Sequence, residues 1–246
     1  MADYISERTA GQIISDSIRL YGKNLPIFFT IYVLPILPVI AIEAAATALE
    51  DDGIYIITTV VESVIATFAL GAMTFAVSDI CLGNRPSVKR SYGALFRVFW
   101  SYLGTYFIYT LATLVGFVLV LVPGFIAMTL LVFSLPASII ERRGPIEACK
   151  RSIQLGKGYY WRIFGILLLA LLLTFVIMYG FLQFSFQITI LIIDPGPAAF
   201  FLYFALGVLS AAAAPLFQIP AILLYYDMRA RKEHFDGAAL AQELMT

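Results

Sequence analysis

The expected fold is decided by residues 141–166, which read ERRGPIEACKRSIQLGKGYYWRIFGI and lie between two long apolar runs. Six basic residues stand in this stretch: Arg142, Arg143, Lys150, Arg151, Lys157 and Arg162. Beside them are three aromatic residues whose rings combine an apolar body with a polar edge, namely Tyr159, Tyr160 and Trp161. Such rings gather at membrane–water boundaries. The stretch therefore indicates a point where the chain meets a membrane surface.

A short helix is predicted within this stretch. Ile146, Cys149 and Ile153 recur at the spacing of one helical face, and charged or amide side chains surround them. We expect residues 145–156 to form an amphipathic helix that lies in the headgroup layer and does not cross the membrane.

The cations of this helix are candidate lipid ligands. If its apolar face enters the acyl boundary, Lys150, Arg151 and Lys157 stand at headgroup height. Each cation near the surface contributes about 1 kcal/mol to the attraction for anionic lipid. We predict that these three side chains bind anionic headgroups. The alternative is that they only set the topology of the neighbouring spans.

The composition is that of an integral membrane protein. Of 246 residues, 61% are hydrophobic and 13% are charged, with a formal net charge of zero and a mean hydropathy of +0.91. A soluble domain carries roughly 25% charged residues, so lipid is the expected solvent for most of the chain. Cys81, Cys149 and His234 lack the spacing of a metal site. We expect no metal, no cofactor and no disulfide.

Six apolar runs are long enough to cross a membrane as helices. They lie at residues 25–48, 54–82, 101–122, 125–140, 163–183 and 198–226. All 16 Lys and Arg residues fall in four other segments, 8–23, 85–97, 142–162 and 229–232. Six spans place these four segments on one face, and the positive-inside rule makes that face cytoplasmic. We expect a multi-pass protein of the bacterial inner membrane with both termini in the cytoplasm.

A parallel internal repeat is predicted. Ser17-Ile18-Arg19-Leu20 matches Ser152-Ile153-Gln154-Leu155, and Ser91 begins a more diverged copy. Each copy lies in an amphipathic helix, over residues 9–21, 86–99 and 145–156, and is followed by two apolar runs. The expected fold is all-α, a single domain over residues 1–246 with repeat units 1–83, 84–143 and 144–236. Three such hairpins would form a compact six-helix bundle, and an inverted-repeat transporter fits poorly.

Three motifs carry a family resemblance. They are Pro123–Gly124 after the third run, GPIEACKRSIQLGKGYYWRIFGI leading into the fifth, and LLYYDMRARKE after the sixth. The chain resembles a bacterial family of six-span membrane proteins, which includes the membrane domain fused to some glycerophosphodiester phosphodiesterases and uncharacterised inner-membrane relatives. The resemblance is sharpest over residues 120–235 and implies the fold more than an activity. The chain ends ten residues after Asp236, so we expect no catalytic domain and carry over no phosphodiesterase chemistry.

Four acidic residues within the apolar runs are candidate site residues. Glu43 and Glu62 lie at similar depth in the first hairpin and could share a proton or bind a cation. Alternatively, each reaches the membrane boundary or bonds a neighbouring helix. Asp79 and Asp227 lie at the inner ends of the second and sixth runs. They could form a cytoplasmic gate or headgroup site, or ion pairs with nearby arginines.

The expected function follows from what these residues can do. The sequence contains no nucleotide-binding loop, H-E-x-x-H motif or Ser/His/Asp pattern, so we predict a non-enzymatic protein. It would organise lipids, chiefly anionic ones, or serve as an accessory or structural subunit of a membrane complex, and would not bind nucleic acid. The alternative is a small-solute or lipid transporter or channel that uses the intramembrane acids.

Overall fold

The computed structural model describes residues 4–191 and 196–245, and all regular secondary structure there is helical. The helices are α1 (Ala10–Lys23), α2 (Leu25–Phe28), the π-helical turn η1 (Phe29–Val33), α3 (Leu34–Ala48), α4 (Asp52–Cys81), α5 (Val88–Arg97), α6 (Phe99–Leu119), α7 (Leu121–Leu131), α8 (Ser134–Ile140), α9 (Pro145–Gly156), α10 (Tyr160–Leu191), α11 (Gly196–Ala213), α12 (Pro215–Glu233) and α13 (Gly237–Met245).

The prediction of six apolar spans is confirmed. Six helical stretches among the described residues are long and apolar enough to cross a membrane: Leu25–Ala48, Asp52–Cys81, Phe99–Leu119, Leu121–Ile140, Tyr160–Phe184 and Ala199–Glu233. Helices α1, α5 and α9 occupy the three segments predicted to be amphipathic. The fifth span ends at Phe184, close to the predicted residue 183, and α10 continues beyond it as one helix to Leu191.

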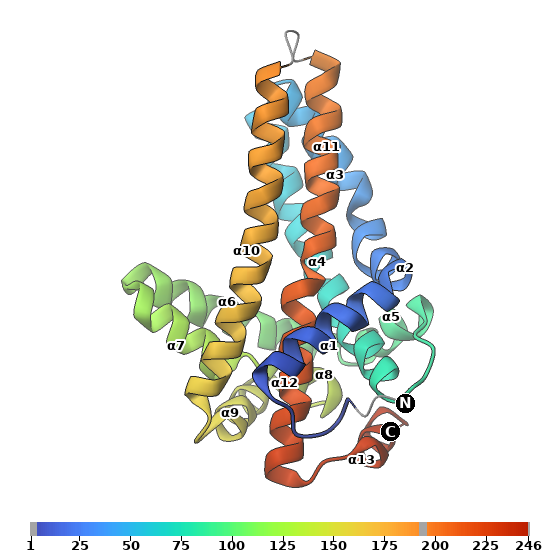
Figure 1. The fold of residues 1–246 in the computed structure, drawn as a ribbon, viewed down its shortest axis with the longest axis vertical. Coiled ribbons are helices and arrows are strands. Elements are labelled where there is room, and N and C mark those ends of the chain that lie inside the picture. The colour runs from blue at the N-terminus through green and yellow to red at the C-terminus, as the bar shows by residue number, and fades with distance from the viewer. Residues whose placement is uncertain (1–3, 192–195, 246) are drawn as a thin grey trace.

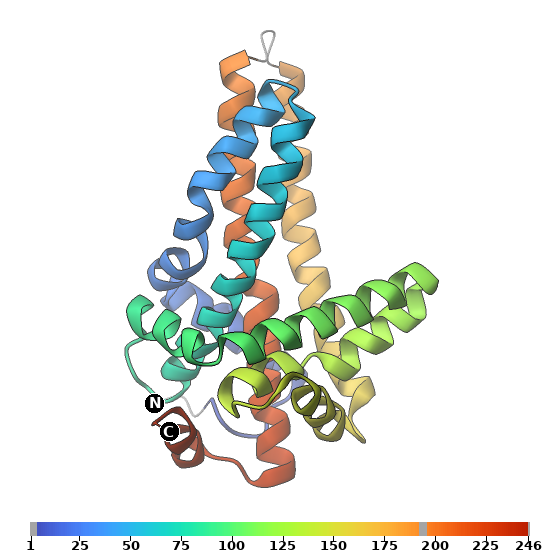
Figure 2. The same ribbon diagram turned by 180° about the vertical axis from the view of Figure 1, so that it is seen from behind.

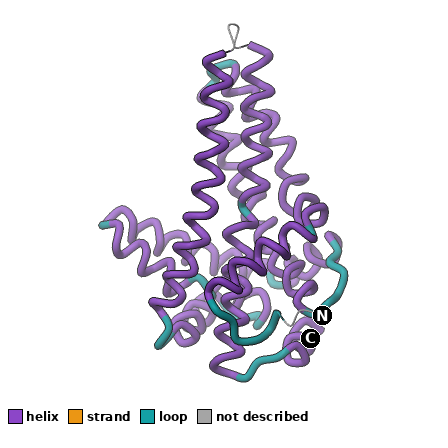
Figure 3. The backbone as a smooth tube through the Cα atoms, in the orientation of Figure 1, coloured by secondary structure: helices purple, strands orange, loops and turns teal. Residues whose placement is uncertain are grey.

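Two hairpins stand upright and side by side, α3–α4 and α10–α11 (Figures 1 and 2). The carboxyl ends of α3 and α10 and the amino ends of α4 and α11 lie at one end of the molecule (Figures 1 and 2). Helices α1, α5, α9 and α13 lie towards the opposite end, with both termini (Figure 3). The segments that carry the Lys and Arg residues therefore gather towards one end, as an even number of spans requires.

The hairpin that is second in the chain, α6–α7, projects sideways instead of joining the upright helices (Figure 2). The buried residues of α6 are Tyr102, Thr105 and Gly116, whereas residues 118–122 around the turn are each more than half exposed. The predicted compact bundle is therefore wrong for this hairpin. The physical reason is that lipid tails are as apolar as these side chains, so packing them against protein brings no hydrophobic gain.

The turn of this hairpin also differs from the prediction. Pro123 and Gly124 were expected to form it, but they lie inside α7, and the chain reverses at Val120, which is extended. A Cβ atom added to Gly116 would lie 2.8 Å from the backbone of Gly124. The absence of a Cβ atom at Gly116 and Gly124 therefore lets α6 and α7 approach closely. This close packing stabilises the hairpin.

Helix α12 forms the centre of the lower end. Every residue from Ile219 to Arg229 is buried, and the helix contacts α1, α4, α9, α10 and α11. A helix that is buried all round has neighbours on every side. The polar residues in the carboxyl-terminal half of α12 therefore need hydrogen-bonding partners within the protein.

The first span is interrupted at η1, and a side chain from α5 compensates. Pro35 has no N–H group, so it cannot donate to the carbonyl of Ile31 four residues earlier. The Tyr92 hydroxyl donates to this carbonyl at 2.8 Å. The Ile31 carbonyl therefore has a hydrogen-bond partner within the protein, which is needed because lipid supplies none.

The fourth and sixth spans are interrupted and satisfied in the same way. Between α7 and α8, the Ser152 hydroxyl of α9 accepts from the N–H of Phe133 at 3.1 Å and donates to the Leu130 carbonyl at 2.6 Å. Next to the break between α11 and α12, the Tyr21 hydroxyl of α1 donates to the carbonyl of Ala212 at 2.6 Å. Each of α1, α5 and α9 thus supplies a hydroxyl group to an interrupted span.

Candidate functional site

The carboxylate of Asp227 is fully buried at the inner end of the sixth span. Arg162 donates to it at 3.0 Å, Arg231 donates to both of its oxygens at 3.1 Å, and the backbone N–H of Arg8 donates at 2.6 Å. Of the two readings left open for Asp227, the structure shows the ion pair with nearby arginines. The residue joins α10, α12 and the segment before α1.

The second acid of this type, Asp79, is 3% exposed near the end of α4. Its carboxylate lies 3.4 Å from the guanidinium group of Arg90 in α5. It therefore also forms an ion pair between neighbouring elements. Asp79 and Asp227 have separate partners and are not brought into one site.

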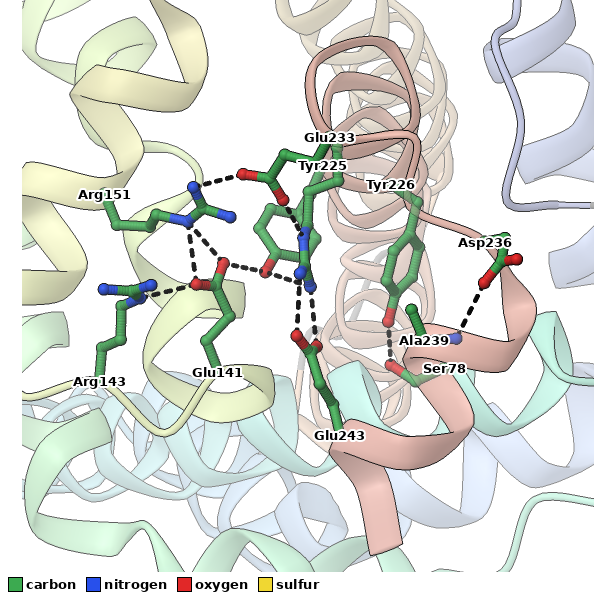
Figure 4. Close-up of polar contacts among 11 residues, drawn as sticks. Ser78, Glu141, Arg143, Arg151, Tyr225, Tyr226, Glu233, Asp236, Ala239 and Glu243 are labelled. Carbon is green, nitrogen blue, oxygen red and sulfur yellow. Dashed lines mark hydrogen bonds and ion pairs between the residues drawn. The ribbon is translucent and has the colours of Figure 1, made fainter. Parts of the chain in front are cut away.

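Glu141 is the centre of a second polar cluster, which the sequence did not single out (Figure 4). Its side chain is 6% exposed and accepts hydrogen bonds from Arg143 at 2.6 Å, Arg151 at 2.9 Å and the Tyr225 hydroxyl at 2.7 Å. Burial alone would raise the pKa of Glu141, but the hydrogen bonds from Arg151, Tyr225 and Arg143 outweigh it and lower that pKa. The carboxylate therefore stays charged at neutral pH.

The cluster extends to the carboxyl-terminal helix. Arg229 donates to both oxygens of Glu243 at 2.8 Å and to Glu233 at 3.1 Å (Figure 4). Its guanidinium carbon also lies 3.5 Å from the ring centroid of Phe235. These contacts hold α13 against α12. Every charge of the cluster has a partner, and Glu141 and Arg229 are 6% and 7% exposed, so removing one member would leave a buried charge without compensation.

The three predicted lipid-binding cations do not share one environment. Arg151 is 14% exposed and lies 2.5 Å from Glu233 in addition to its bonds with Glu141. Lys150 and Lys157 are exposed, and neither makes an ion pair with any residue that the structure describes. The equal role expected for Arg151 is therefore corrected: its charge is used inside the protein, because α9 packs against the inner end of α12.

One face of α9 combines apolar and cationic side chains. Ile146, Lys150, Ile153 and Lys157 are all exposed and follow one another at intervals of four, three and four residues, so they line the same side. The opposite face, with Ala148, Ser152 and Leu155, is buried in the protein. The exposed face has the composition of a helix at the headgroup–acyl boundary.

An apolar groove lies near α9, because Tyr160 in its lining donates to the Ile153 carbonyl of α9 at 3.1 Å. It lies between α7 and α10, has a volume of about 420 Å³, and is lined by Val122, Phe125, Ile126, Thr129, Leu130, Tyr160, Trp161 and Phe164. Trp161 follows Lys157 by four residues and is 86% exposed. The sequence indicated the aromatic residues but not the groove, because α7 and α10 meet only in the folded chain.

A second hollow near the same end also contains cations. It lies at the elbow between α5 and α6, has a volume of about 480 Å³, and is lined in part by Arg97, Trp100 and Arg142. Both arginines are exposed and make no ion pair within the described part of the chain. This elbow offers a matched comparison for the face of α9.

The remaining candidates, Glu43 and Glu62, are half-buried and lie in contact across the α3–α4 hairpin. Glu62 lies near Glu43 across this hairpin, and the Thr59 hydroxyl donates to Glu43 at 2.9 Å. Among the described residues no group of three or more potential metal ligands occurs. The arrangement suits a shared proton, because two carboxyl groups close together in apolar surroundings do not both ionise.

Glu62→Gln is expected to abolish this shared proton while the protein still folds, because the amide can donate to Glu43 in its place. Infrared spectroscopy of the protein in detergent at neutral pH should show one protonated carboxyl band in the wild type and none in the variant. A band of equal intensity in both proteins would contradict the shared proton.

Comparisons with protein-family models, with curated proteins and with solved structures found no match to this chain.

Proposed function

We propose that this chain is a non-enzymatic, multi-pass protein of the bacterial inner membrane that binds and organises anionic phospholipid. The observation that carries the proposal is the link between the apolar α7–α10 groove and α9: Tyr160, which lines the groove, donates to the Ile153 carbonyl of the helix that carries the exposed Lys150. A phospholipid has the same two parts in the same order, a charged headgroup and an acyl chain.

The proposed binding mode uses each part of this surface. Lys150 and Lys157 attract the phosphate group, and Trp161 lies at the boundary between headgroups and chains. One acyl chain lies in the groove against side chains such as Phe125 and Phe164. The groove contributes shape and dispersion contacts more than hydrophobic gain, since the chain leaves an environment that is already apolar.

The proposed orientation places α1, α5 and α9 at the cytoplasmic surface, because the Lys and Arg segments lie there. The proposed fold is a parallel repeat of three units, each an amphipathic helix followed by a hairpin. The three hydroxyl contacts support it. Tyr92 of the second unit bonds the first hairpin, Ser152 of the third bonds the second, and Tyr21 of the first bonds the third. The contacts thus run in a cyclic order between units, although the three hydroxyl groups do not occupy equivalent positions of the repeat. We also propose that the chain belongs to the bacterial six-span family that it resembles in sequence. In the same proposal it can serve as a subunit of a membrane complex.

The lipid proposal is tested with the double variant Lys150→Gln/Lys157→Gln. Each cation near the surface contributes about 1 kcal/mol, so the variant should bind phosphatidylglycerol roughly thirtyfold more weakly. Native mass spectrometry of the full chain in detergent, titrated with phosphatidylglycerol, measures this change. A reporter fused after Thr246 should read cytoplasmic in wild type and variant, which shows that insertion is intact.

The matched control is Arg97→Gln/Arg142→Gln, which removes the same charge at the α5–α6 elbow. It should retain most of the affinity. Equal weakening by both double variants would show a response to overall charge and would overturn the α9 site, as would unchanged affinity in the first variant.

A further inference from the structure

A cavity of about 300 Å³ lies where the three interrupted spans meet. Its lining includes Tyr32 of η1, Val132 between α7 and α8, and Ala214 between α11 and α12. Non-helical backbone at membrane depth is tolerated where it is buried in protein or lines a cavity. The three interruptions therefore surround one place, which is separate from the surface of α9.

Three tyrosine hydroxyl groups at this cavity lack protein partners. Tyr32, Tyr106 and Tyr109 line it, and none of their hydroxyls makes a hydrogen bond to another residue that the structure describes. Three other tyrosines that pack between helices differ from them. The hydroxyls of Tyr21, Tyr92 and Tyr102 each donate to a backbone carbonyl, at 2.6, 2.8 and 2.7 Å.

This contrast points to a ligand. A hydroxyl group that faces a cavity at membrane depth without a protein partner needs another hydrogen-bonding group, because the apolar surroundings of a span supply little water. Thr110 and the amide of Gln218 add further hydrogen-bonding groups to the same lining. Polar groups that converge in an otherwise apolar cavity between helices are typical of a binding site.

The lining also defines the charge of the ligand. No Lys, Arg, His, Asp or Glu is among the described residues that line the cavity. A charged headgroup would lose its hydration there without gaining an opposite charge. Hydroxyl and amide groups instead suit uncharged hydroxyl and ester oxygens.

The way in is from the lipid. Thr110 lines the cavity and is exposed on α6, and the outer part of α6 diverges from the upright helices (Figure 2). Leu70, Leu135 and Ile222 supply apolar lining next to the polar groups. A molecule with acyl chains can therefore place its headgroup in the cavity while its chains stay in the membrane.

We propose that this cavity binds the uncharged headgroup of a neutral lipid of the diacylglycerol class, with Tyr106 and Tyr109 as hydrogen-bonding residues. The site goes beyond the anionic lipid site of α9 and shares no residue with it.

The test is a crossed titration of the full chain in detergent with dioctanoylglycerol and with dioctanoyl phosphatidylglycerol, which differ only in the headgroup. Tyr106→Phe/Tyr109→Phe should weaken binding of the neutral lipid tenfold or more, because two hydrogen bonds are lost, and should leave binding of the anionic lipid unchanged. Lys150→Gln/Lys157→Gln should do the reverse. The thermal midpoint should not fall in the tyrosine variant, since neither hydroxyl bonds the protein.

The control is Tyr55→Phe, which removes an exposed hydroxyl near the far end of α4; it should bind both lipids as the wild type does. Unchanged affinity for dioctanoylglycerol in the double tyrosine variant would overturn the cavity site. So would an equal loss for both lipids, because the cavity would then not select an uncharged headgroup. Neither result would bear on the α9 site, which the lysine variant tests.

Discussion

Asp227→Ala is expected to lower the free energy of unfolding by about 3–5 kcal/mol, the range found when one partner of a buried ion pair is removed. The carboxylate is fully buried and accepts from Arg162, from Arg231 and from the backbone of Arg8. Without it, Arg162 would have no carboxylate partner among the described residues, whereas Arg231 would keep only Glu7, at 2.8 Å. The loss would also release the segment before α1 from α12.

Titration with sodium dodecyl sulfate in mixed micelles, followed by circular dichroism, measures this loss. The control is Asp52→Ala at the amino end of α4, where the side chain is exposed. This variant should change the free energy of unfolding by no more than about 0.5 kcal/mol. Asp227→Asn should fall between the two, since the amide keeps an acceptor oxygen but not the charge. A wild-type unfolding curve for Asp227→Ala would mean that the ion pairs do not stabilise the fold.

Ser152→Ala is expected to cost about 2–4 kcal/mol, because it leaves two backbone groups unpaired at once and each costs about 1–3 kcal/mol. The Ser152 side chain is fully buried, and its hydroxyl bonds both sides of the break between α7 and α8. Tyr92→Phe and Tyr21→Phe each remove one bond to one carbonyl, so each should cost only about 1 kcal/mol. The same detergent titration measures all three variants.

Ser17→Ala is the matched control for Ser152. Ser17 holds the equivalent place in the predicted repeat and is also buried, but its hydroxyl donates to Ile13 within its own helix. Removing the Ser17 hydroxyl leaves no backbone group at a helix break without a partner. The free energy of unfolding should therefore fall by less than about 1 kcal/mol. Equal losses at Ser17 and Ser152 would contradict the role of Ser152 at the break.

The sequence by itself determined the number of spans and the places of the three short helices. Long apolar runs and helical spacing are local properties, because the bilayer thickness and the helical rise per residue decide which segments cross. Residues 145–156 could thus be assigned to a helix from Pro145, Ile146, Cys149 and Ile153 alone, and α9 has those bounds.

The tertiary structure alone decided what each polar residue does. Lys150 and Arg151 are neighbours in the chain, yet the first is exposed and the second bonds Glu141 and Glu233. Side chains at adjacent positions of a helix point in different directions. Only the packing of α9 against α12 determines which of these two side chains lies next to a carboxylate. Glu141 gave no signal in the sequence because its partner Tyr225 lies 84 residues away.

The same reason explains the sideways hairpin and the central cavity. Lipid and protein are nearly equivalent surroundings for an apolar side chain, so hydropathy cannot tell whether α6 packs against the upright helices or leaves them. Prolines such as Pro35 indicate where a span can be interrupted, but not which hydroxyl will satisfy the interruption. That choice, and the meeting of three interruptions around Tyr32, Tyr106 and Tyr109, depends on contacts between segments far apart in the chain.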